Sequence, residues 1–164
     1  MDFIWTPWRY QYIINADKTD GCPFCEKISM GDDRKALIVY RGKHNFIILN
    51  LFPYTSGHAM VVPYQHLDSL GALPPEATTE MMELTQRLEG VIRKVYNPHG
   101  TNLGMNLGHA AGAGVRGHIH MHVLPRWTGD SSFIGTIAET RVIPENLETT
   151  WERIREAWPV DSVR

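Results

Sequence analysis

Residues 117–124 read GHIHMHVL, and from His118 to Val123 histidine alternates with apolar residues over the length of a strand. Successive side chains of a strand face opposite sides of a sheet. The alternation therefore predicts a strand over 117–124 whose three imidazoles share one face and whose apolar side chains enter the core. A solvated polar face is the simplest alternative, but three histidines in strict alternation favour a chemical role for that face.

A single metal ion bound by all three histidines fits this pattern poorly. At a rise of roughly 3.3 Å per residue, the α-carbons of His118 and His122 lie about 13 Å apart, whereas a zinc–nitrogen bond measures about 2.0–2.1 Å. Two alternating histidines can share an ion, but three on one straight strand do so only under strain. We therefore expect the three histidines to have different tasks.

The histidine stretch also suits chemistry at phosphorus. A neutral imidazole is a good nucleophile at pH 7, because its ordinary pKa near 6.5 leaves much of it unprotonated. The glycine-rich segment 108–114 precedes the stretch, and its backbone N–H groups offer contacts for phosphate oxygens. The segment PRWTGD at 125–130 follows, and we expect its cation and aromatic ring to close the site. The glycine-rich segment alone is weak evidence, since most such turns are only turns.

The rest of the chain predicts the surroundings of this stretch. Three short apolar runs separated by turn-forming residues predict an antiparallel meander with strands at 36–40, 44–50 and 58–63. Apolar residues at helical spacing predict one main helix between Pro75 and Asn97. A further strand near 102–107 and a short amphipathic helix near 144–158 complete the pattern.

These elements predict an α+β fold: an antiparallel sheet of about five strands, one main helix and a short C-terminal helix. No internal repeat or linker divides the chain, so we expect a single domain over 1–164. Residues 1 to about 20 are rich in Trp and Tyr without a clear period, which indicates an irregular aromatic arm.

Composition limits the classes of partner. The 164 residues are 43% hydrophobic and 21% charged, as is usual for one soluble domain. Sixteen Lys and Arg against eighteen Asp and Glu give a net charge of −2, which argues against a duplex nucleic acid as partner. No run approaches the roughly 18 apolar residues of a membrane span, and the first residues do not resemble a secretion signal. We expect no membrane partner and a cytoplasmic location.

The two cysteines form the sequence CPFC at 22–25, a spacing typical of metal binding or of thiol redox chemistry. The redox alternative needs a βαβ context that places the first thiolate at a helix N-terminus. Nothing around residues 19–27 predicts the preceding strand, so the context favours zinc. Two thiolates need two further ligands to close a tetrahedral zinc site.

The signature His118-x-His120-x-His122 resembles that of the histidine triad family of nucleotidyl hydrolases and transferases. The resemblance continues in order along the chain at Asn50, at GHAMVVP (57–63) and at Asn106. The flanks that resemble the bacterial diadenosine tetraphosphate phosphorylase branch are WTP (5–7), PRWTGDSSF (125–133) and VIPE (142–145). Together these segments span most of residues 5–158.

The resemblance implies a role for each matching position. His120 corresponds to the nucleophile that attacks the α-phosphorus, and His122 to the residue that hydrogen-bonds a phosphate or bridging oxygen and helps the leaving group depart. The implied substrate-binding residues are Asn50 at the ribose, Asn106 and Gly114 at the phosphates, Phe46 and Ile48 at the base, and His58 near the site. Core packing remains an alternative for Phe46 or Ile48, and pairing with a backbone carbonyl remains one for His58.

Zinc-bearing members of the superfamily pair a C-x-x-C with the first histidine of the triad and with a histidine after the G-H-x-x-V-x-P strand. The resemblance thus implies one structural zinc per chain, held by Cys22, Cys25, His66 and His118. This assignment leaves His120 and His122 for the substrate. The phosphorylase branch does not always keep these cysteines, so the zinc assignment and the branch assignment rest on resemblance to somewhat different relatives.

The implied activity is cleavage of dinucleoside polyphosphates through an AMP–histidine intermediate, which water resolves to AMP or phosphate resolves to ADP. No residue decides between these two acceptors. An AMP-phosphoramidase or general nucleotidyl hydrolase is an alternative within the same chemistry, and a non-catalytic nucleotide-binding or scaffold protein is an alternative of another class. The resemblance also implies a homodimer formed through the main helix and an edge strand.

Overall fold

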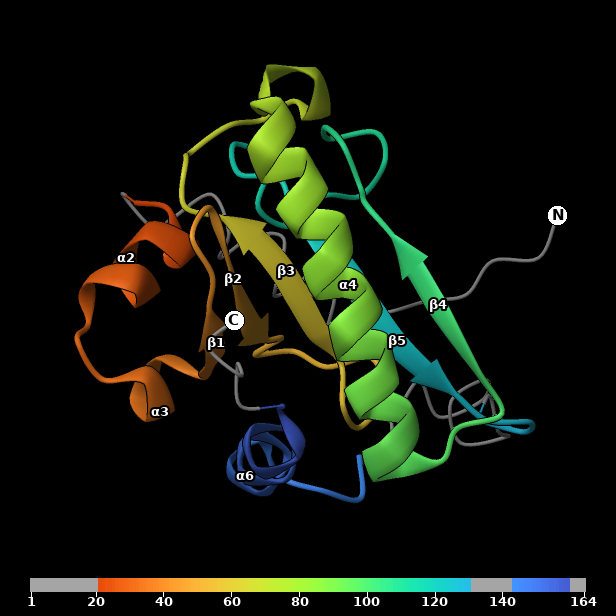
Figure 1. The fold of residues 1–164 in the computed structure, drawn as a ribbon. Helices are drawn as coiled ribbons and strands as arrows, with labels where there is room; N and C mark the ends of the chain where they lie inside the picture. Colours follow the sequence, from red (N-terminus) through yellow and green to blue (C-terminus); the bar gives the residue numbers. More distant parts are fainter. Residues whose placement is uncertain (1–20, 131–142, 160–164) are drawn as a thin grey trace, which may run out of the picture.

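The computed structural model describes residues 21–130 and 143–159. Within these residues the strands form one antiparallel sheet in the order β1-β2-β3-β5-β4 (Figure 1). The strands are β1 (Ile38–Arg41), β2 (Asn45–Leu49), β3 (Ala59–Pro63), β4 (Gly100–Gly104) and β5 (Met121–Arg126). The helices are α2 (Pro23–Ser29), α3 (Asp33–Ala36), the 3-10 helix η1 (Leu70–Ala72), α4 (Pro75–Tyr96) and α6 (Leu147–Ala157). The expected α+β fold is confirmed, whereas the aromatic arm lies outside the described residues.

Helix α4 is the expected main helix and lies along one face of the sheet (Figure 1). It begins with Pro75, whose fixed φ suits a first helical position. Its last residue is Tyr96, and the C-cap residue Asn97 adopts a left-handed φ of 45° ahead of a proline. Among the described helices, none is both long enough and apolar enough to cross a membrane.

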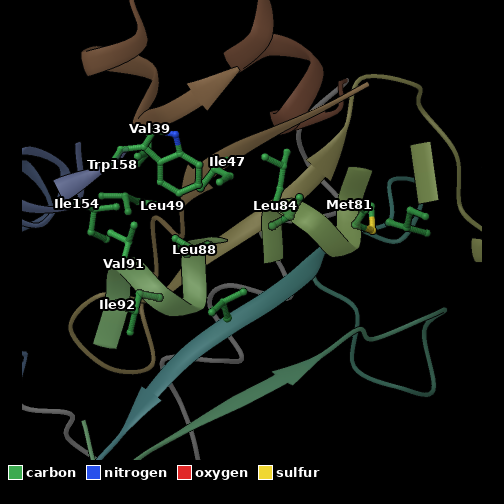
Figure 2. Packing of buried hydrophobic residues seen from close by; sticks show 14 of the residues in the cluster. Val39, Ile47, Leu49, Met81, Leu84, Leu88, Val91, Ile92, Ile154 and Trp158 are labelled. Carbon is green, nitrogen blue, oxygen red and sulfur yellow. The ribbon is translucent and has the colours of Figure 1, made fainter. Parts of the chain in front are cut away.

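The main core lies between α4, α6 and the sheet (Figure 2). Leu88 and Ile92 of α4 have no solvent-exposed surface, and Ile154 of α6 is equally buried. Burial of each such side chain contributes about 1.5–3 kcal/mol. The labelled members of this cluster are Val39, Ile47, Leu49, Met81, Leu84, Leu88, Val91, Ile92, Ile154 and Trp158.

The opposite face of the sheet carries a second apolar cluster, which includes Phe24 of α2. In β3, Ala59 and Val61 belong to the main core, while Met60 and Val62 belong to this second cluster. We call this second face the site face, because Met60 pairs directly with His122 of β5. Both faces of the sheet therefore carry an apolar cluster, and the histidines lie on the side away from α4.

The strand over the histidine stretch is shorter than the expected range of 117–124. Strand β5 begins at Met121, so His118 and His120 precede it. Pairing with β3 reaches only as far as Met121, and the Ile119 N–H donates instead to the carbonyl oxygen of Leu67 at 2.8 Å. The predicted alternation of side chains nevertheless holds, because Ile119 and Val123 enter the main core and the histidines do not.

Two other strand boundaries differ from expectation for local reasons. Strand β1 begins at Ile38 rather than at residue 36, because Ala36 ends α3 and Leu37 adopts a left-handed φ of 64°. Strand β4 spans Gly100–Gly104 rather than 102–107, since it pairs with β5 between Arg126 and His122. Asn106 consequently lies in the connection between these strands.

The turn between β1 and β2 depends on Glu80 of α4. The Glu80 carboxylate accepts hydrogen bonds from the backbone N–H groups of Lys43, His44 and Asn45 at 2.6, 2.7 and 2.7 Å, and from the Asn45 side chain at 2.9 Å. Burial alone would raise the pKa of Glu80, but these hydrogen bonds outweigh burial and lower it. The carboxylate thus fixes the start of β2 against α4.

We expect Glu80→Gln to lower the free energy of unfolding by about 2 kcal/mol at pH 7, because charge-assisted bonds become weaker or are lost. A pKa lowered by folding contributes stability above the unfolded pKa of about 4.3, and that contribution disappears as the pH falls through the folded pKa. Urea unfolding of the parent and of Glu80→Gln should show a difference in the free energy of unfolding at pH 7 that becomes smaller below pH 4. A difference in the free energy of unfolding that does not change with pH would contradict this role for the carboxylate.

Candidate functional site

The three histidines of the stretch are buried together on the site face. His118, His120 and His122 are 0%, 5% and 8% exposed. The ring centroids of His120 and His122 lie 4.8 Å apart. Phe24 of α2 contacts the rings of His118 and His120 at 5.3 and 5.1 Å. Sequence reasoning missed Phe24, although its position between two candidate ligands in CPFC is a usable signal.

The protonation of His120 follows from a backbone contact. Its Nδ1 lies 2.9 Å from the carbonyl oxygen of His118. Because a carbonyl only accepts, Nδ1 carries the proton and Nε2 of the neutral ring keeps its lone pair. Burial lowers the pKa of His120 and outweighs this hydrogen bond, which acts to raise it. The site therefore holds a buried, neutral imidazole with an unprotonated Nε2.

His122 is also neutral at physiological pH. Burial, with a smaller contribution from the charge of His120, lowers the pKa of His122 to about 4. His122 lies in a row across the sheet that runs Ile48, Met60, His122, Gly104 on one face. A Cβ at Gly104 would meet no atom of the described residues within 4 Å. The strand beside His122 therefore leaves open space on the site face.

Asn50 and His58 lie beside His122, as expected. The Asn50 Oδ1 accepts the Phe52 N–H at 2.9 Å, and its Nδ2 lies 3.4 Å from the His58 Nε2. The His58 Nε2 lies 2.9 Å from the Nδ1 of His122. The His58 Nδ1 accepts the backbone N–H of Tyr54 at 3.1 Å.

Tyr54 is a second residue that sequence reasoning missed. Its ring lies 4.7 Å from that of His58 and 6.1 Å from that of His122. It belongs to the turn at 53–57, which periodicity describes only as a connection. Gly57 at the end of this turn has a φ of 82°, and a Cβ there would lie 2.7 Å from the Tyr96 ring. Glycine is therefore required immediately before His58.

Phe46 and Ile48 differ in their distance from the histidines. Phe46 is fully buried, pairs with Val62 and stacks on Tyr64 with centroids 5.3 Å apart. Ile48 is 4% exposed and occupies the same row as His122. Packing thus accounts for the contacts of Phe46, while Ile48 is the better candidate for a pocket wall.

Asn106 and Gly114 are half-buried in the connection between β4 and β5. Within the described residues, neither Asn106 nor Gly114 forms a hydrogen bond to one of the three histidines. The turn at 108–113 closes on itself through hydrogen bonds from Gly112 N–H to His109 and from Ala113 N–H to Gly108. Their expected contacts with phosphate stay predictions.

We expect the cation of segment 125–130 to help close the site, but the structure places Arg126 elsewhere. Arg126 pairs with Gly100, at the end of β5 remote from His120. Its guanidinium donates to both carboxylate oxygens of Asp130 and to the Asn102 side chain. Trp127 lies edge-on to Tyr96 with ring centroids 6.4 Å apart. These contacts stabilise the end of the β4–β5 pair instead.

Cys22, Cys25, His66 and His118 form a second cluster next to the histidine pair. Their ligand atoms all lie within 4.8 Å of one another. The Nδ1 of His118 lies 3.3 Å from the Cys22 sulfur and 3.8 Å from the Cys25 sulfur, and the Nδ1 of His66 lies 3.5 Å from the Cys25 sulfur. The expected ligands are therefore brought together from α2, the segment after β3 and the start of the histidine stretch.

This cluster has the chemistry and spacing of a zinc site. The Nε2 of His118 donates to the carbonyl oxygen of Pro63 at 2.8 Å, so its Nδ1 keeps a lone pair directed at the thiols. Tetrahedral zinc bonds of about 2.3 Å to sulfur and 2.0–2.1 Å to nitrogen place the two ligand atoms about 3.5 Å apart. The observed separations agree with that value, and the four residues fit a closed site.

Comparisons with known proteins agree with this geometry. The family model described as HIT domain matches residues 32–129. The chain is 40% identical over 163 residues to AP-4-A phosphorylase of Mycobacterium tuberculosis, covering 94% of this chain and 83% of that protein. It is 33% identical over 95 residues to bis(5'-nucleosyl)-tetraphosphatase [asymmetrical] of Schizosaccharomyces pombe, covering 58% and 52% of the two chains.

A solved structure matches the fold. The crystal structure of a Zn-bound histidine triad family protein from Mycobacterium smegmatis superposes with a TM-score of 0.68 at 32% identity. The match covers 84% of this chain and 93% of that protein.

Proposed function

The chain belongs to the HIT domain family, and from this premise we propose that it cleaves dinucleoside polyphosphates such as diadenosine tetraphosphate by nucleotidyl transfer through His120. The observation that carries the proposal is the buried, neutral His120 with an unprotonated Nε2 beside His122. The 40% identity to a protein named AP-4-A phosphorylase supports the substrate class.

In the first step the lone pair on Nε2 of His120 forms a bond to the α-phosphorus. The bond from that phosphorus to its bridging oxygen breaks, and ATP leaves with the electron pair. The modified ring carries a positive charge, which its Nδ1–H shares with the carbonyl oxygen of His118. His122 donates a hydrogen bond to a phosphate or bridging oxygen as negative charge grows there.

In the second step an acceptor oxygen attacks the same phosphorus and the N–P bond returns its electron pair to Nε2. Inorganic phosphate gives ADP, whereas water gives AMP and loses a proton. We propose phosphate as the preferred acceptor, which the 40% identity to a protein named AP-4-A phosphorylase supports.

The substrate-binding residues of this proposal surround the histidine pair. Asn50 binds the ribose hydroxyls, and its half-buried position beside His58 and His122 supports that role. Ile48 contributes a wall of the base pocket from the row that contains His122. Asn106 and Gly114 contact the phosphates from the loop that precedes the histidine stretch.

Zinc is proposed as a structural ion, one per chain. Cys22, Cys25, His66 and His118 would hold it, and four protein ligands leave no open position for catalysis. When bound, the ion joins α2 to the segment that carries His120. The carbonyl group of the ligand His118 is the one that fixes the proton of His120.

A homodimer is proposed through the edge strand and the main helix. Strand β4 is at an edge of the sheet formed by the described strands. Leu103 of β4 is 51% exposed and Met82 of α4 is also 51% exposed, which supports a covered surface. Sedimentation of the purified chain measures its oligomeric state directly. The cytoplasmic location stays a prediction.

Incubation of the chain with diadenosine tetraphosphate, with and without phosphate, tests the proposed reaction. We expect ATP plus ADP in phosphate, and ATP plus AMP without it. ATP plus AMP under both conditions would identify a hydrolase and overturn the phosphate preference. Faster release of AMP from an adenosine phosphoramidate would favour the phosphoramidase alternative, and no product from either substrate would refute the nucleotidyl transfer.

A further inference from the structure

The direction of the hydrogen bonds around His58 is set by the backbone. The Tyr54 N–H lies 3.1 Å from the Nδ1 of His58 and can only donate. Nδ1 therefore keeps its lone pair. A neutral His58 must then carry its proton on Nε2.

That proton determines the tautomer of His122. The His58 Nε2 lies 2.9 Å from the His122 Nδ1, so His58 donates and His122 accepts. The reverse direction would leave His58 without a proton on either nitrogen. The neutral His122 consequently carries its own proton on Nε2, and within the described residues that group has no hydrogen-bond partner.

Asn50 does not change this assignment. Its Oδ1 accepts the Phe52 N–H at 2.9 Å, which turns its Nδ2 toward His58. The 3.4 Å separation between Nδ2 and the His58 Nε2 joins two groups that both carry protons, so it is a contact and not a hydrogen bond.

Burial makes the arrangement stable. His58 is 1% exposed and His122 is 8% exposed, so a charge on either ring would lose most of its hydration. The lowering of the pKa of His122 to about 4 agrees with a ring that stays neutral. When both rings are neutral, only one placement of the protons lets His58 Nδ1 accept the Tyr54 N–H and also forms a hydrogen bond between the two rings.

We propose that His58 is a positioning residue, and not a substrate contact, that holds His122 as a neutral Nε2–H donor directed at the phosphate oxygens. The statement rests on the proposed function. In this role His122 gives a hydrogen bond and transfers no proton, because loss of its Nε2 proton would leave an anionic ring. A polyphosphate leaving group departs without needing that proton.

The direction of the hydrogen bond can be measured without any turnover. In protein labelled with 15N at histidine side chains, we expect a scalar coupling across the hydrogen bond that joins the proton on His58 Nε2 to His122 Nδ1. His122 should appear as a neutral ring with its proton on Nε2. A proton on His122 Nδ1, or a doubly protonated His122 at pH 7, would overturn the proposal.

Two variants separate positioning from substrate contact. His58→Phe keeps a buried ring but removes the donor, so we expect kcat for diadenosine tetraphosphate to fall about 10- to 100-fold while KM stays within about twofold. His58→Gln retains an N–H at a similar reach and should lie within about fivefold of the parent kcat. Thermal melting of both variants identifies any loss of folding.

The outcomes distinguish the two proposals. A rise in KM with unchanged kcat in folded His58→Phe would make His58 a substrate contact and overturn the positioning role. Equal loss of kcat in folded His58→Gln and His58→Phe would also contradict it, since the donor would then not matter. A parent protein without turnover would refute the proposed function, while the scalar coupling would still decide which histidine donates.

Discussion

Replacing His120 with alanine should lower the rate of diadenosine tetraphosphate cleavage by at least about 10⁴-fold. Alanine offers no lone pair to form the bond to the α-phosphorus, so neither the release of ATP nor the transfer to phosphate can proceed through the same route. The contacts of Asn50 and His122 with the substrate would remain and still allow binding. Chromatographic separation of ATP and ADP from unreacted substrate measures the effect.

A matched control distinguishes chemistry from folding. His44 lies in the turn before β2 and contributes its backbone N–H to Glu80, so His44→Ala should retain activity. His120→Ala should keep the parent melting temperature within a few degrees and its zinc content. Activity that survives in a folded His120→Ala protein would remove His120 from the role of nucleophile.

Loss of a zinc ligand should have the largest effect on stability. Cys22→Ser removes one of four ligand atoms that lie within 4.8 Å of each other. An ion present at 100 to 1,000 times its Kd adds about 2.7–4.1 kcal/mol to folding. For a chain of this size that corresponds to a fall in Tm of about 5–16 °C. Calorimetry with metal analysis of the untagged protein measures both quantities.

Met30→Ser provides the matched control for the zinc prediction. Met30 caps the same helix α2 but is 47% exposed and contributes no ligand atom. The Met30→Ser variant should bind one zinc per chain and have a melting temperature close to that of the parent. Parent protein that contains no zinc, or that melts at the same temperature in a strong chelator, would contradict the assignment of the four ligands.

The sequence predicts the sheet and main helix well because their signals are local. The apolar spacing between Pro75 and Asn97 and the turn residues between the strands need no knowledge of distant contacts. The start of β5 is different. Whether His118 and His120 join a strand depends on where β3 stops pairing and on the carbonyl group of Leu67, which is remote in sequence.

The candidate site shows the same division. The spacing of the three histidines and the resemblance to a family lead to the proposed nucleophile and to the proposed ligand set. Tyr54 and Phe24 have no periodic signal, since one lies in a turn and the other in a short helix. The tautomer of His58 depends on a backbone N–H four residues earlier, and only the folded turn brings that group to Nδ1.

The placement of Arg126 illustrates the limit of sequence proximity. It follows His122 by four residues, which along a strand separates the α-carbons by about 13 Å. The carboxylate of Asp130 and the side chain of Asn102 engage its guanidinium at the far end of the strand pair. Nearness in sequence to a candidate catalytic histidine therefore does not place this cation in the same site.

In the proposed reaction an adenylyl group passes through His120. The direct measurement is mass spectrometry of the protein quenched during turnover of diadenosine tetraphosphate without phosphate, followed by peptide mapping at a pH that preserves N–P bonds. We expect a mass gain of one adenylyl group on His120, which disappears as ADP forms when phosphate is added. Steady turnover with no modified His120, or with the group on another residue, would contradict it.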